Sequence, residues 1–598
     1  MAKQNHIPNK RVMQIGMLLF LAAFGYFLSL PFTAKYTITD TIAENHFGSR
    51  VALIKESSPD LINSEFSSKA SILSALSKAS KDGTVAAKVN IGISPENINS
   101  MVEAYAGKPF ILEDVVKAYE AEGLSEKASK LREWFGWFDG QEIAETDLRA
   151  QLESKAAELN AGIVGLNLGA DAKFSLLKEA AKTPAKSNAF IVFLLTFGLG
   201  TIGALMHILP KRVELPGIKN HRIWFDSLNS RGIIGIIVGT FLILFYIVIY
   251  WWPAWMTEWA ALTDPIAYAL TGSGAGQWFL YGMFYTFAVV VMGIRFLIKY
   301  RHSRYQQIRT FSVMFFQVAF AFIIANGLQL FHLPYADLKN IWPLDYSFFF
   351  DYRIDKMLSA GTIGYFMLGW GMFLVLIGVP LFTYFYGKRW YCSWICGCGG
   401  LAETAGDSFR QLSDKSLKAW KFERISIHSV LVIAVVMTIL VSYTTWNEVA
   451  YGKQGAYLFG INSYDVRHWY WFGISAVFAG VVGTGFYPMM GNRVWCRFGC
   501  PLAAYLGFIQ RFKSRFRITT NGGQCISCGN CSTYCEQGID VRWYAQRGQN
   551  IVRSSCVGCG VCSSVCPRGV LNLENGPDSG RTEIQAIHIG RDEVKILS

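Results

Sequence analysis

Charged residues are scarce in this chain of 598 residues. Asp, Glu, Lys and Arg make up only 17% of it, whereas hydrophobic residues make up 52%. This composition argues against a single water-soluble core and indicates an integral membrane protein. The net charge of +13 leaves nucleic acid, anionic lipid and acidic proteins open as partners, so the position of the charges has to distinguish among them.

Cysteine is missing from most of the chain, because all 13 cysteines lie between Cys392 and Cys566. Residues 33–187 contain no cysteine, no C-x-x-C-H haem-attachment motif and no evident flavin or phosphate motif. Their pattern of apolar and charged residues predicts amphipathic helices. We therefore interpret this segment as a mostly helical exported domain with a structural or docking role. The apolar run before it is longer than a usual signal core, so we expect an uncleaved anchor.

Eight apolar segments are long enough to cross about 30 Å of hydrocarbon, and nearly all lack Asp, Glu, Lys and Arg. They are residues 13–32, 188–209, 232–252, 278–297, 311–331, 362–386, 428–446 and 468–489. We therefore expect a polytopic α-helical membrane protein with about eight transmembrane helices. The lack of buried carboxylates argues against an ion-coupled redox pump.

Basic residues concentrate in alternate loops between these segments. They are Lys211, Arg212, Lys219, Arg222 and Arg231 after the second span, Lys299, Arg301, Arg304 and Arg309 after the fourth, and seven Lys or Arg between Lys388 and Arg424 after the sixth. By the positive-inside rule, both termini and all 13 cysteines are expected on the cytoplasmic side of a bacterial inner membrane. Thiols stay reduced there and are available to metals. This topology explains much of the basic excess without nucleic acid as a partner.

Two cysteine runs near the carboxyl end repeat the spacing C-x2-C-x2-C-x3-C. This is the run of bacterial two-cluster ferredoxins, in which the fourth cysteine of each run binds the other cluster. One [4Fe–4S] cluster is therefore expected on one set of four cysteines and a second cluster on another. The sets are Cys525, Cys528, Cys531 and Cys566 for the first, and Cys556, Cys559, Cys562 and Cys535 for the second.

Structural zinc is the main alternative for these runs, because it also uses C-x2-C pairs. Four-coordinate zinc gives no reason for a third and a fourth cysteine at these spacings, repeated twice. Disulfides are disfavoured by the reducing compartment. Glu536 stands where the run usually has Pro, so we expect a change in the turn or in the potential near Cys535 but no loss of a ligand.

Five further cysteines follow the sixth and eighth spans. "RWYCSWICGC" contains Cys392, Cys396 and Cys398, and "RVWCRFGCP" contains Cys496 and Cys500. Each motif has a basic residue, an aromatic residue and then C-x3-C. Two cysteines at i and i+4 project from one face of a helix, so two such pairs on neighbouring helices offer four thiolates.

Duplicated C-x3-C motifs followed by a two-cluster ferredoxin run resemble the membrane-bound polyferredoxins. This family includes the quinol dehydrogenase subunit of periplasmic nitrate reductase, the nitrous oxide reductase regulator and the cytochrome oxidase accessory protein. The resemblance covers about residues 362–570. The chain departs from the family at Gly397, where Pro is frequent, in the additional Cys398, and in lacking the flavin-attachment sequence of some relatives.

The resemblance implies a membrane electron-transfer protein that works with respiratory or other redox subunits. Electrons would pass between the ferredoxin clusters and the quinone pool or an exported partner. A third iron-sulfur or other metal centre is expected on Cys392, Cys396, Cys496 and Cys500, with Cys398 as a further candidate. Redox-active thiols, transient metal ligands and simply buried cysteines are the alternatives for these motifs. An assembly factor that reduces or delivers metal is the alternative for the whole protein.

No haem motif is evident, because the histidines lie near span ends rather than in the middle of the membrane. The residues in question are His207, His332, His428 and His468. His332 and His468 share the expected exported side, which leaves a haem or quinone pocket there as an alternative to interfacial histidines. The expected domains are an anchor at 1–32, an exported domain at 33–187, a seven-helix membrane domain at 188–510, a 2[4Fe–4S] ferredoxin domain at 511–575 and a tail at 576–598.

Overall fold

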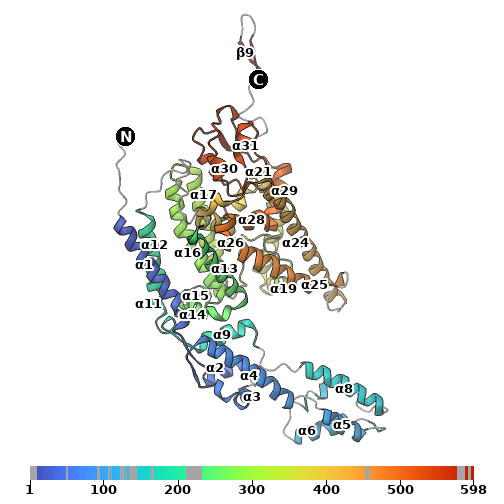
Figure 1. Ribbon diagram of the computed structural model, residues 1–598. Coiled ribbons are helices and arrows are strands. Elements are labelled where there is room, and N and C mark those ends of the chain that lie inside the picture. The colour runs from blue at the N-terminus through green and yellow to red at the C-terminus, as the bar shows by residue number, and fades with distance from the viewer. Residues whose placement is uncertain are drawn as a thin grey trace. The chain divides into compact units, whose positions relative to one another are not determined.

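The computed structural model is mostly helical (Figure 1). It describes residues 10–48, 51–90, 95–105, 108–109, 111–121, 128–129, 131–133, 145–162, 168–210, 232–451, 457–458, 461–575, 586–589 and 594–597. The basic loop Lys211 to Arg231, on which part of the expected orientation rests, lies outside these residues.

Within the described part of the chain, six helices are long and apolar enough to cross a membrane. They are Lys10–Phe32, Ala189–Ile208, Gln277–Lys299, Arg304–Phe331, Thr362–Tyr386 and Leu417–Asn447. Each coincides with an expected span, which gives the chain its transmembrane character. The expected span 232–252 forms a helix that is followed by a second arm, Pro253–Leu262, bent by 113°. A proline cannot continue the preceding helix, because its ring removes a backbone donor and clashes with the previous turn.

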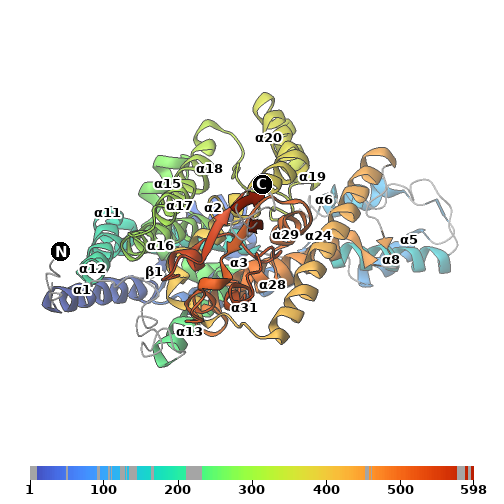
Figure 2. The ribbon, with the colours of Figure 1, turned by 90° about the horizontal axis from the view of Figure 1, so that it is seen from above.

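The elements of these spans, and the helices α14, α15 and α19 that lie between them, carry the following labels and bounds. They are α1 (Lys10–Ser29), η1 (Leu30–Phe32), α11 (Ala189–Phe193), η5 (Leu194–Gly198), α12 (Leu199–Ile208), α13 (Ile233–Trp251), η7 (Pro253–Met256), α14 (Thr257–Leu262), α15 (Asp264–Thr271), α16 (Gln277–Lys299), α17 (Arg304–Phe315), η8 (Phe316–Ile324), α18 (Ala325–Gly327), η9 (Leu328–Phe331), α19 (Asp351–Ser359), α20 (Thr362–Phe373), η10 (Leu374–Gly378), α21 (Val379–Tyr386) and α24 (Leu417–Tyr451). Figure 2 shows α16 beside α17, which it contacts.

The expectation of an eighth span at 468–489 is not confirmed. That segment is helical, as α25 (Ser463–Tyr470), η12 (Trp471–Val482), α26 (Gly483–Gly485) and α27 (Tyr487–Met490), but it is not among the helices that reach the required length and apolarity. Glycines of this segment lie directly against α13. A Cβ on Gly480 would lie 2.6 Å from Cε2 of Tyr250, and a Cβ on Gly485 would lie 2.7 Å from Cγ1 of Ile243. Small residues therefore let this segment pack closely on α13.

The segment 333–350, between η9 and α19, is non-helical but packs into the helix bundle. Nε1 of Trp342 donates a hydrogen bond to Oγ1 of Thr438 on α24 (3.1 Å), and the hydroxyl of Tyr391 donates to the carbonyl of Lys339 (3.0 Å). Ile341 is 2% exposed and shares its core with Cys392. Surrounding protein is what permits irregular backbone within a membrane domain.

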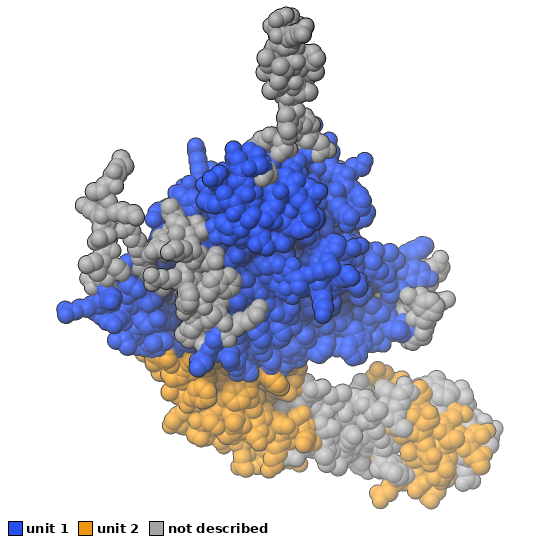
Figure 3. Space-filling view, turned by 45° about the horizontal axis from the view of Figure 1, so that its top comes forward, with its two compact units in different colours: residues 1–24, 194–251, 263–598 blue, residues 25–193, 252–262 orange. Residues whose placement is uncertain are grey.

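One of the chain's two compact units comprises residues 25–193 and 252–262, coloured orange in Figure 3. Besides α14, α11, η1 and η7, its helices include α2 (Asp40–Phe47), α3 (Val51–Ser57), α4 (Lys69–Asn90), α5 (Pro95–Tyr105), α6 (Leu112–Ala121), α8 (Glu145–Gly162), α9 (Ala170–Ala180) and α10 (Pro184–Ser187). The strands β1 (Lys35–Thr37), β2 (Glu65–Phe66) and β3 (Ala181–Lys182) form an antiparallel sheet in the order β2-β1-β3. Tyr36 lies opposite both Phe66 and Ala181 at its centre.

A buried charged cluster fixes the segment 252–262 within this unit. Lys69 forms an ion pair with Glu258 and donates to Oγ1 of Thr257 (2.9 Å), while the hydroxyl of Tyr36 donates to Oε1 of Glu258 (2.6 Å). All four side chains are buried. A buried carboxylate is tolerated only when such partners satisfy it. No sequence pattern predicts that Glu258 pairs with Lys69, because the two residues are far apart in the chain.

The ferredoxin-type part lies in the other unit, together with the helix bundle. Its elements are α29 (Pro501–Lys513), β6 (Arg517–Thr520), α30 (Asn530–Thr533), α31 (Val541–Gln546), α32 (Val561–Ser564) and β7 (Leu571–Glu574), and a separate hairpin of β8 (Ala586–Ile589) and β9 (Val594–Leu597) follows. Strands β6 and β7 pair antiparallel, with Arg517 opposite Glu574. Phe516, Ile518 and Val570 form a core with the cysteines of both runs.

Candidate iron-sulfur centres

Each ferredoxin-type cysteine run folds as a loop that leads into a one-turn helix. Gly529 precedes α30 with φ 78°, and Gly560 precedes α32 with φ 72°. Glycine adopts this left-handed conformation at no steric cost, which explains its place in both runs. The helices carry Cys531 and Cys562, which are both buried. The repeated sequence is therefore a repeated structure.

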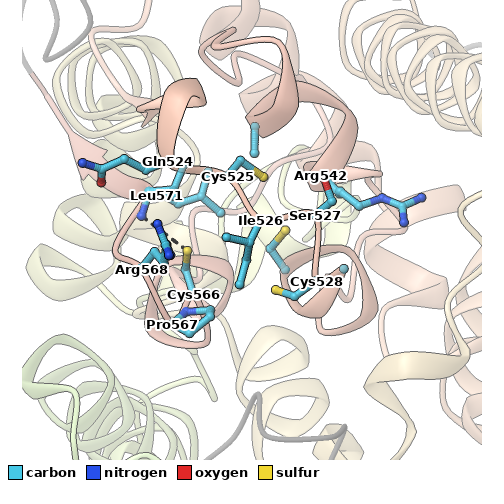
Figure 4. A pocket seen from close by; sticks show the side chains of 14 residues that line it. Gln524, Cys525, Ile526, Ser527, Cys528, Arg542, Cys566, Pro567, Arg568 and Leu571 are labelled. Carbon is cyan, nitrogen blue, oxygen red and sulfur yellow. Dashed lines mark hydrogen bonds between the residues drawn. The ribbon is translucent and has the colours of Figure 1, made fainter.

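Four cysteines line one hollow, and three of them are labelled in Figure 4. They are Cys525, Cys528, Cys531 and Cys566, the set expected for the first cluster. The backbone amide of Val570 donates a hydrogen bond to Sγ of Cys566 (3.3 Å). Burial raises the pKa of the Cys531 thiol to about 12. Such a thiol ionises only with a compensating positive charge, which a bound metal supplies.

The second expected set is also brought together, and it is more deeply enclosed. Burial, followed by the neighbouring Cys559, Cys556 and Cys535 thiols, raises the pKa of Cys562 well above its ordinary value. Burial likewise raises the pKa of Cys556 to about 11. These four residues are the donors that the C-x2-C-x2-C-x3-C spacing assigns to the second cluster.

The two C-x3-C motifs meet in one core, where Cys392, Cys396, Cys496 and Cys500 are all buried. Burial raises the pKa of Cys500 first, and the neighbouring Cys496, Cys392 and Cys396 thiols raise it further. The four thiols expected for a third centre are therefore neighbours.

The local geometry of these motifs differs from the helical pairs expected. The first motif is split between α22 (Arg389–Cys392) and α23 (Gly397–Thr404), and the second between α28 (Val494–Phe498) and α29. The prediction that each pair lies at i and i+4 on one helix is therefore wrong. The amide of Cys396 donates instead to the carbonyl of Tyr391 (2.8 Å), and the amide of Cys500 donates to that of Trp495 (2.9 Å). The aromatic residue before each first cysteine thus has the same role in both motifs.

Cys398, the additional cysteine, lies beside this set. Its thiol forms a hydrogen bond with Cys396, and this bond lowers the pKa of Cys396. Lys339 and Arg493 favour the same thiolate through their positive charge. Lys339 belongs to the irregular segment 333–350, and no sequence pattern predicts that it lies near the cysteines.

Glu536 enters a buried ionic network at the junction of the ferredoxin-type part and the bundle. Its carboxylate pairs with Arg493 (Oε1 to Nη2, 3.0 Å) and with Arg410 (Oε2 to Nη1, 3.1 Å). Both arginines also pair with Glu403, at 3.0 and 2.7 Å. Arg493 Nη1 lies 3.8 Å from Sγ of Cys496 as a hydrogen-bond donor. The departure from Pro after Cys535 is therefore an ionic link to the second C-x3-C motif.

Direct hydrogen bonds also connect the second ferredoxin-type run to the first C-x3-C motif and to α17. Oγ of Ser393 donates to the carbonyl of Val557 (2.6 Å), and Nε2 of Gln306 donates to that of Cys559 (2.8 Å). Val557 belongs to the same core as Cys396. The run and the motif are thus packed against each other.

Within the residues that the structure describes, no group of three or more His, Cys, Asp or Glu side chains is close enough together to hold a single metal ion. His207, one of the histidines considered for haem, hydrogen-bonds through Nδ1 to the carbonyl of Met13 (3.1 Å).

Comparison with known proteins agrees with the cysteine chemistry. The 4Fe-4S binding domain family matches residues 368–416 and 470–519, which contain both C-x3-C motifs. The 4Fe-4S dicluster domain family matches residues 517–567, which contain both ferredoxin-type runs.

Two curated proteins are similar to part of the chain. The electron transport protein YccM of Escherichia coli (strain K12) is 27% identical over 164 residues, 26% of this chain and 43% of that protein. The methylamine utilization ferredoxin-type protein MauN of Methylobacillus flagellatus is 24% identical over 157 residues, 26% of this chain and 51% of that protein. The chain thus spans about half the length of these relatives, and no solved structure matches it. The resemblance drawn from the cysteine runs is confirmed: the chain carries ferredoxin-type 4Fe–4S domains of the kind found in the polyferredoxin family.

Proposed function

We propose that this chain is a membrane-bound iron-sulfur protein that relays electrons. The packing of the second ferredoxin-type run against the first C-x3-C motif carries the proposal. It places Cys559 and Val557 of that run against the core of the C-x3-C thiols, while the other cysteines of the run share a second core with the first run. A [4Fe–4S] cluster bound there supplies one-electron chemistry without making or breaking substrate bonds. The two relatives, named as an electron transport protein and a ferredoxin-type protein, support this reading.

The ligand sets follow the expectations from the sequence. Cys525, Cys528, Cys531 and Cys566 hold one cluster, and Cys556, Cys559, Cys562 and Cys535 hold the second. Cys392, Cys396, Cys496 and Cys500 hold a third. The match of the 4Fe-4S binding domain family across both C-x3-C motifs supports the third centre.

The surroundings of the third set suit an anionic group. Four thiolates around a cluster give it net negative charge, and burying such charge requires nearby cations. Arg493 and Lys339 act on Cys396, and Lys388 acts on Cys392. Neutral, simply buried cysteines would not need these three cations.

The relay runs between the ferredoxin clusters, the third centre and either the quinone pool or an exported redox partner. In this arrangement the chain lies in a bacterial inner membrane with both termini in the cytoplasm. The segment 33–187 is exported, the membrane domain spans 188–510, and the clusters of residues 511–575 face the cytoplasm.

Removing one cluster ligand tests the relay. Cys528→Ala should lose one cluster's EPR signal together with electron transfer from reduced methyl viologen to decylubiquinone in proteoliposomes. Thr533→Ala, in the same run, is the matched control and should retain both. Electron transfer that persists after loss of the signal would refute the proposal.

A further inference from the structure

Cys528 is the most accessible thiol of the proposed relay. The structure describes all 13 cysteines, and Cys528 is the one exposed cysteine among them. In the second set Cys556 and Cys562 are buried, and in the third set all four thiols are buried. The rate of electron transfer falls steeply with distance, so a soluble partner has to approach the first set. The first set is therefore the end of the relay that is open to solvent.

Apolar side chains are exposed on both elements that border this thiol. Ile526 is 55% exposed in the loop of the first run, and Trp543 on α31 is 43% exposed. Nε2 of Gln546, also on α31, donates a hydrogen bond to Oγ of Ser527 in that loop (2.6 Å). The guanidinium of Arg547 lies over the Trp543 ring, 3.9 Å from its centroid. Tryptophan and arginine are enriched at protein interfaces.

Exposed arginines flank the same hollow. Arg542 and Arg568 line it, and Figure 4 shows them on opposite sides of Cys525 and Cys566. Within the part of the chain that the structure describes, neither these two nor Arg547 forms an ion pair, and all three are exposed. These residues form the Cys528 surface, which consists of Ile526, Cys528, Arg542, Trp543, Arg547 and Arg568.

The acidic side chains of the ferredoxin-type part do not neutralise this surface. Residues 517–575 contain three of them, Glu536, Asp540 and Glu574. Glu536 is buried, and Asp540 accepts a hydrogen bond from Oγ of Ser532 (2.7 Å). Glu574 is not among the residues that line the hollow. The Cys528 surface is therefore positively charged, and charge complementarity selects an acidic partner.

A different basic side of this part adjoins the membrane spans. The amide of Arg515 donates to the carbonyl of Tyr384 (2.7 Å), at the end of the span Thr362–Tyr386. Figure 1 shows α30 and α31 at the end of this unit opposite α15 and α19. Anionic lipid fits the side of Arg515, whereas a soluble partner fits the Cys528 surface.

We propose that the Cys528 surface docks an acidic, soluble protein that carries one electron at a time. The inference rests on the proposed relay and names the partner at its cytoplasmic end. One electron passes between the carrier and the cluster held by the first set, so that one is oxidised as the other is reduced, and no bond forms or breaks. Transient redox encounters of this kind need a contact of less than about 1,200 Å².

Surface plasmon resonance tests the docking on the full-length, iron-loaded protein in mild detergent, with an acidic [2Fe–2S] ferredoxin and an acidic flavodoxin as probes. Arg542→Glu/Arg568→Glu should weaken binding by about tenfold or more, because like charges then face each other. Arg542→Lys/Arg568→Lys keeps the charge and should retain most of the affinity. Lys513→Glu, an equal change of charge on the side of Arg515, is the control and should bind as the original protein does.

Three results would overturn the docking surface. They are the absence of binding to either probe, equal affinity of the original protein and the Glu pair, and a Glu pair that loses only binding to phosphatidylglycerol vesicles. The last result would assign the arginines to lipid.

Two electron donors separate the docking surface from the relay. Freeze-quench EPR should show the Glu pair's first cluster reduced by the ferredoxin probe at least tenfold more slowly than in the original protein. Reduced methyl viologen, a small dye that needs no protein interface, should reduce it no more slowly than before. Equal slowing with both donors at full iron content would contradict docking. Rapid reduction of the first cluster by the probe, without onward transfer to decylubiquinone in proteoliposomes, would support the docking surface and refute the relay.

Discussion

Oε1 of Glu536 lies 3.0 Å from Nη2 of Arg493, and both side chains are almost completely buried. Glu536 directly follows the last cysteine of the first ferredoxin-type run, and Arg493 donates to Sγ of Cys496 in the second C-x3-C motif. The ion pair therefore connects the first ferredoxin-type run to the second C-x3-C motif through Arg493. A proline at position 536 could not make this link.

Glu536→Gln should destabilise the junction. The substitution leaves Arg410 and Arg493 with less negative charge in a buried environment, where breaking such a pair costs about 3–5 kcal/mol. We expect a lower temperature for thermal loss of the clusters' visible absorbance. Glu574→Gln, on the more exposed strand β7, is the control and should change little. Equal behaviour of the two variants would contradict a structural role for the network.

Lys339→Met should lower the midpoint potential of the third centre and leave the two ferredoxin clusters unchanged. The substitution removes a positive charge that acts on Cys396, so the reduced and more negative state becomes less favourable. Redox titration followed by EPR measures the shift. Lys356→Met, an exposed change on α19, serves as the control. An unmoved potential would show that Lys339 does not act on this centre.

The apoprotein should lose stability at alkaline pH, unlike the iron-loaded form. Burial raises the pKa of Cys531 in the folded apoprotein to about 12, above the ordinary thiol value of about 8.5. This raised pKa favours folding fully below the ordinary value, and the contribution is lost as the pH rises through about 12. Thermal unfolding at about pH 7 and about pH 10 compares the two forms. A stability of the apoprotein that does not change across this interval would contradict the assignment.

Lys69→Met should destabilise the unit that contains α14. The change leaves the carboxylate of Glu258 buried without its cation, at a cost of about 3–5 kcal/mol. The double variant with Glu258→Met removes both charges and should recover much of the loss. Limited proteolysis of residues 25–193 reports the stability of this unit. Additive losses in the double variant would argue against a direct pairing.

The cysteine sets of the ferredoxin-type part could be predicted from the sequence because their spacing is a local pattern. The crossing of Cys566 to the first run also follows from that pattern, and the structure places it with Cys525 around one hollow. The sequence also predicts that the two C-x3-C motifs lie together. It does so by placing each cysteine pair on one helix, whereas in the structure each pair is divided between two helices. In each motif the second cysteine, Cys396 or Cys500, caps a new helix that begins at the next residue, Gly397 or Pro501.

The contacts that were not predicted all join residues far apart in the chain. Lys339 meets the cysteines through an irregular segment that carries no periodic signal. In the sequence Glu536 is a departure from the motif, and only the fold brings Arg493 and Arg410 beside it. The largely apolar run 468–489 predicts a span, which the structure does not confirm, and its glycines pack closely on α13.

The iron and acid-labile sulfide content of the anaerobically purified protein tests the central claim most directly. Three [4Fe–4S] clusters predict about twelve irons per chain, and Cys500→Ala should lower this content by about a third while the ferredoxin signals persist in EPR. About eight irons, unchanged by Cys500→Ala, would contradict a third centre at the end of the membrane spans.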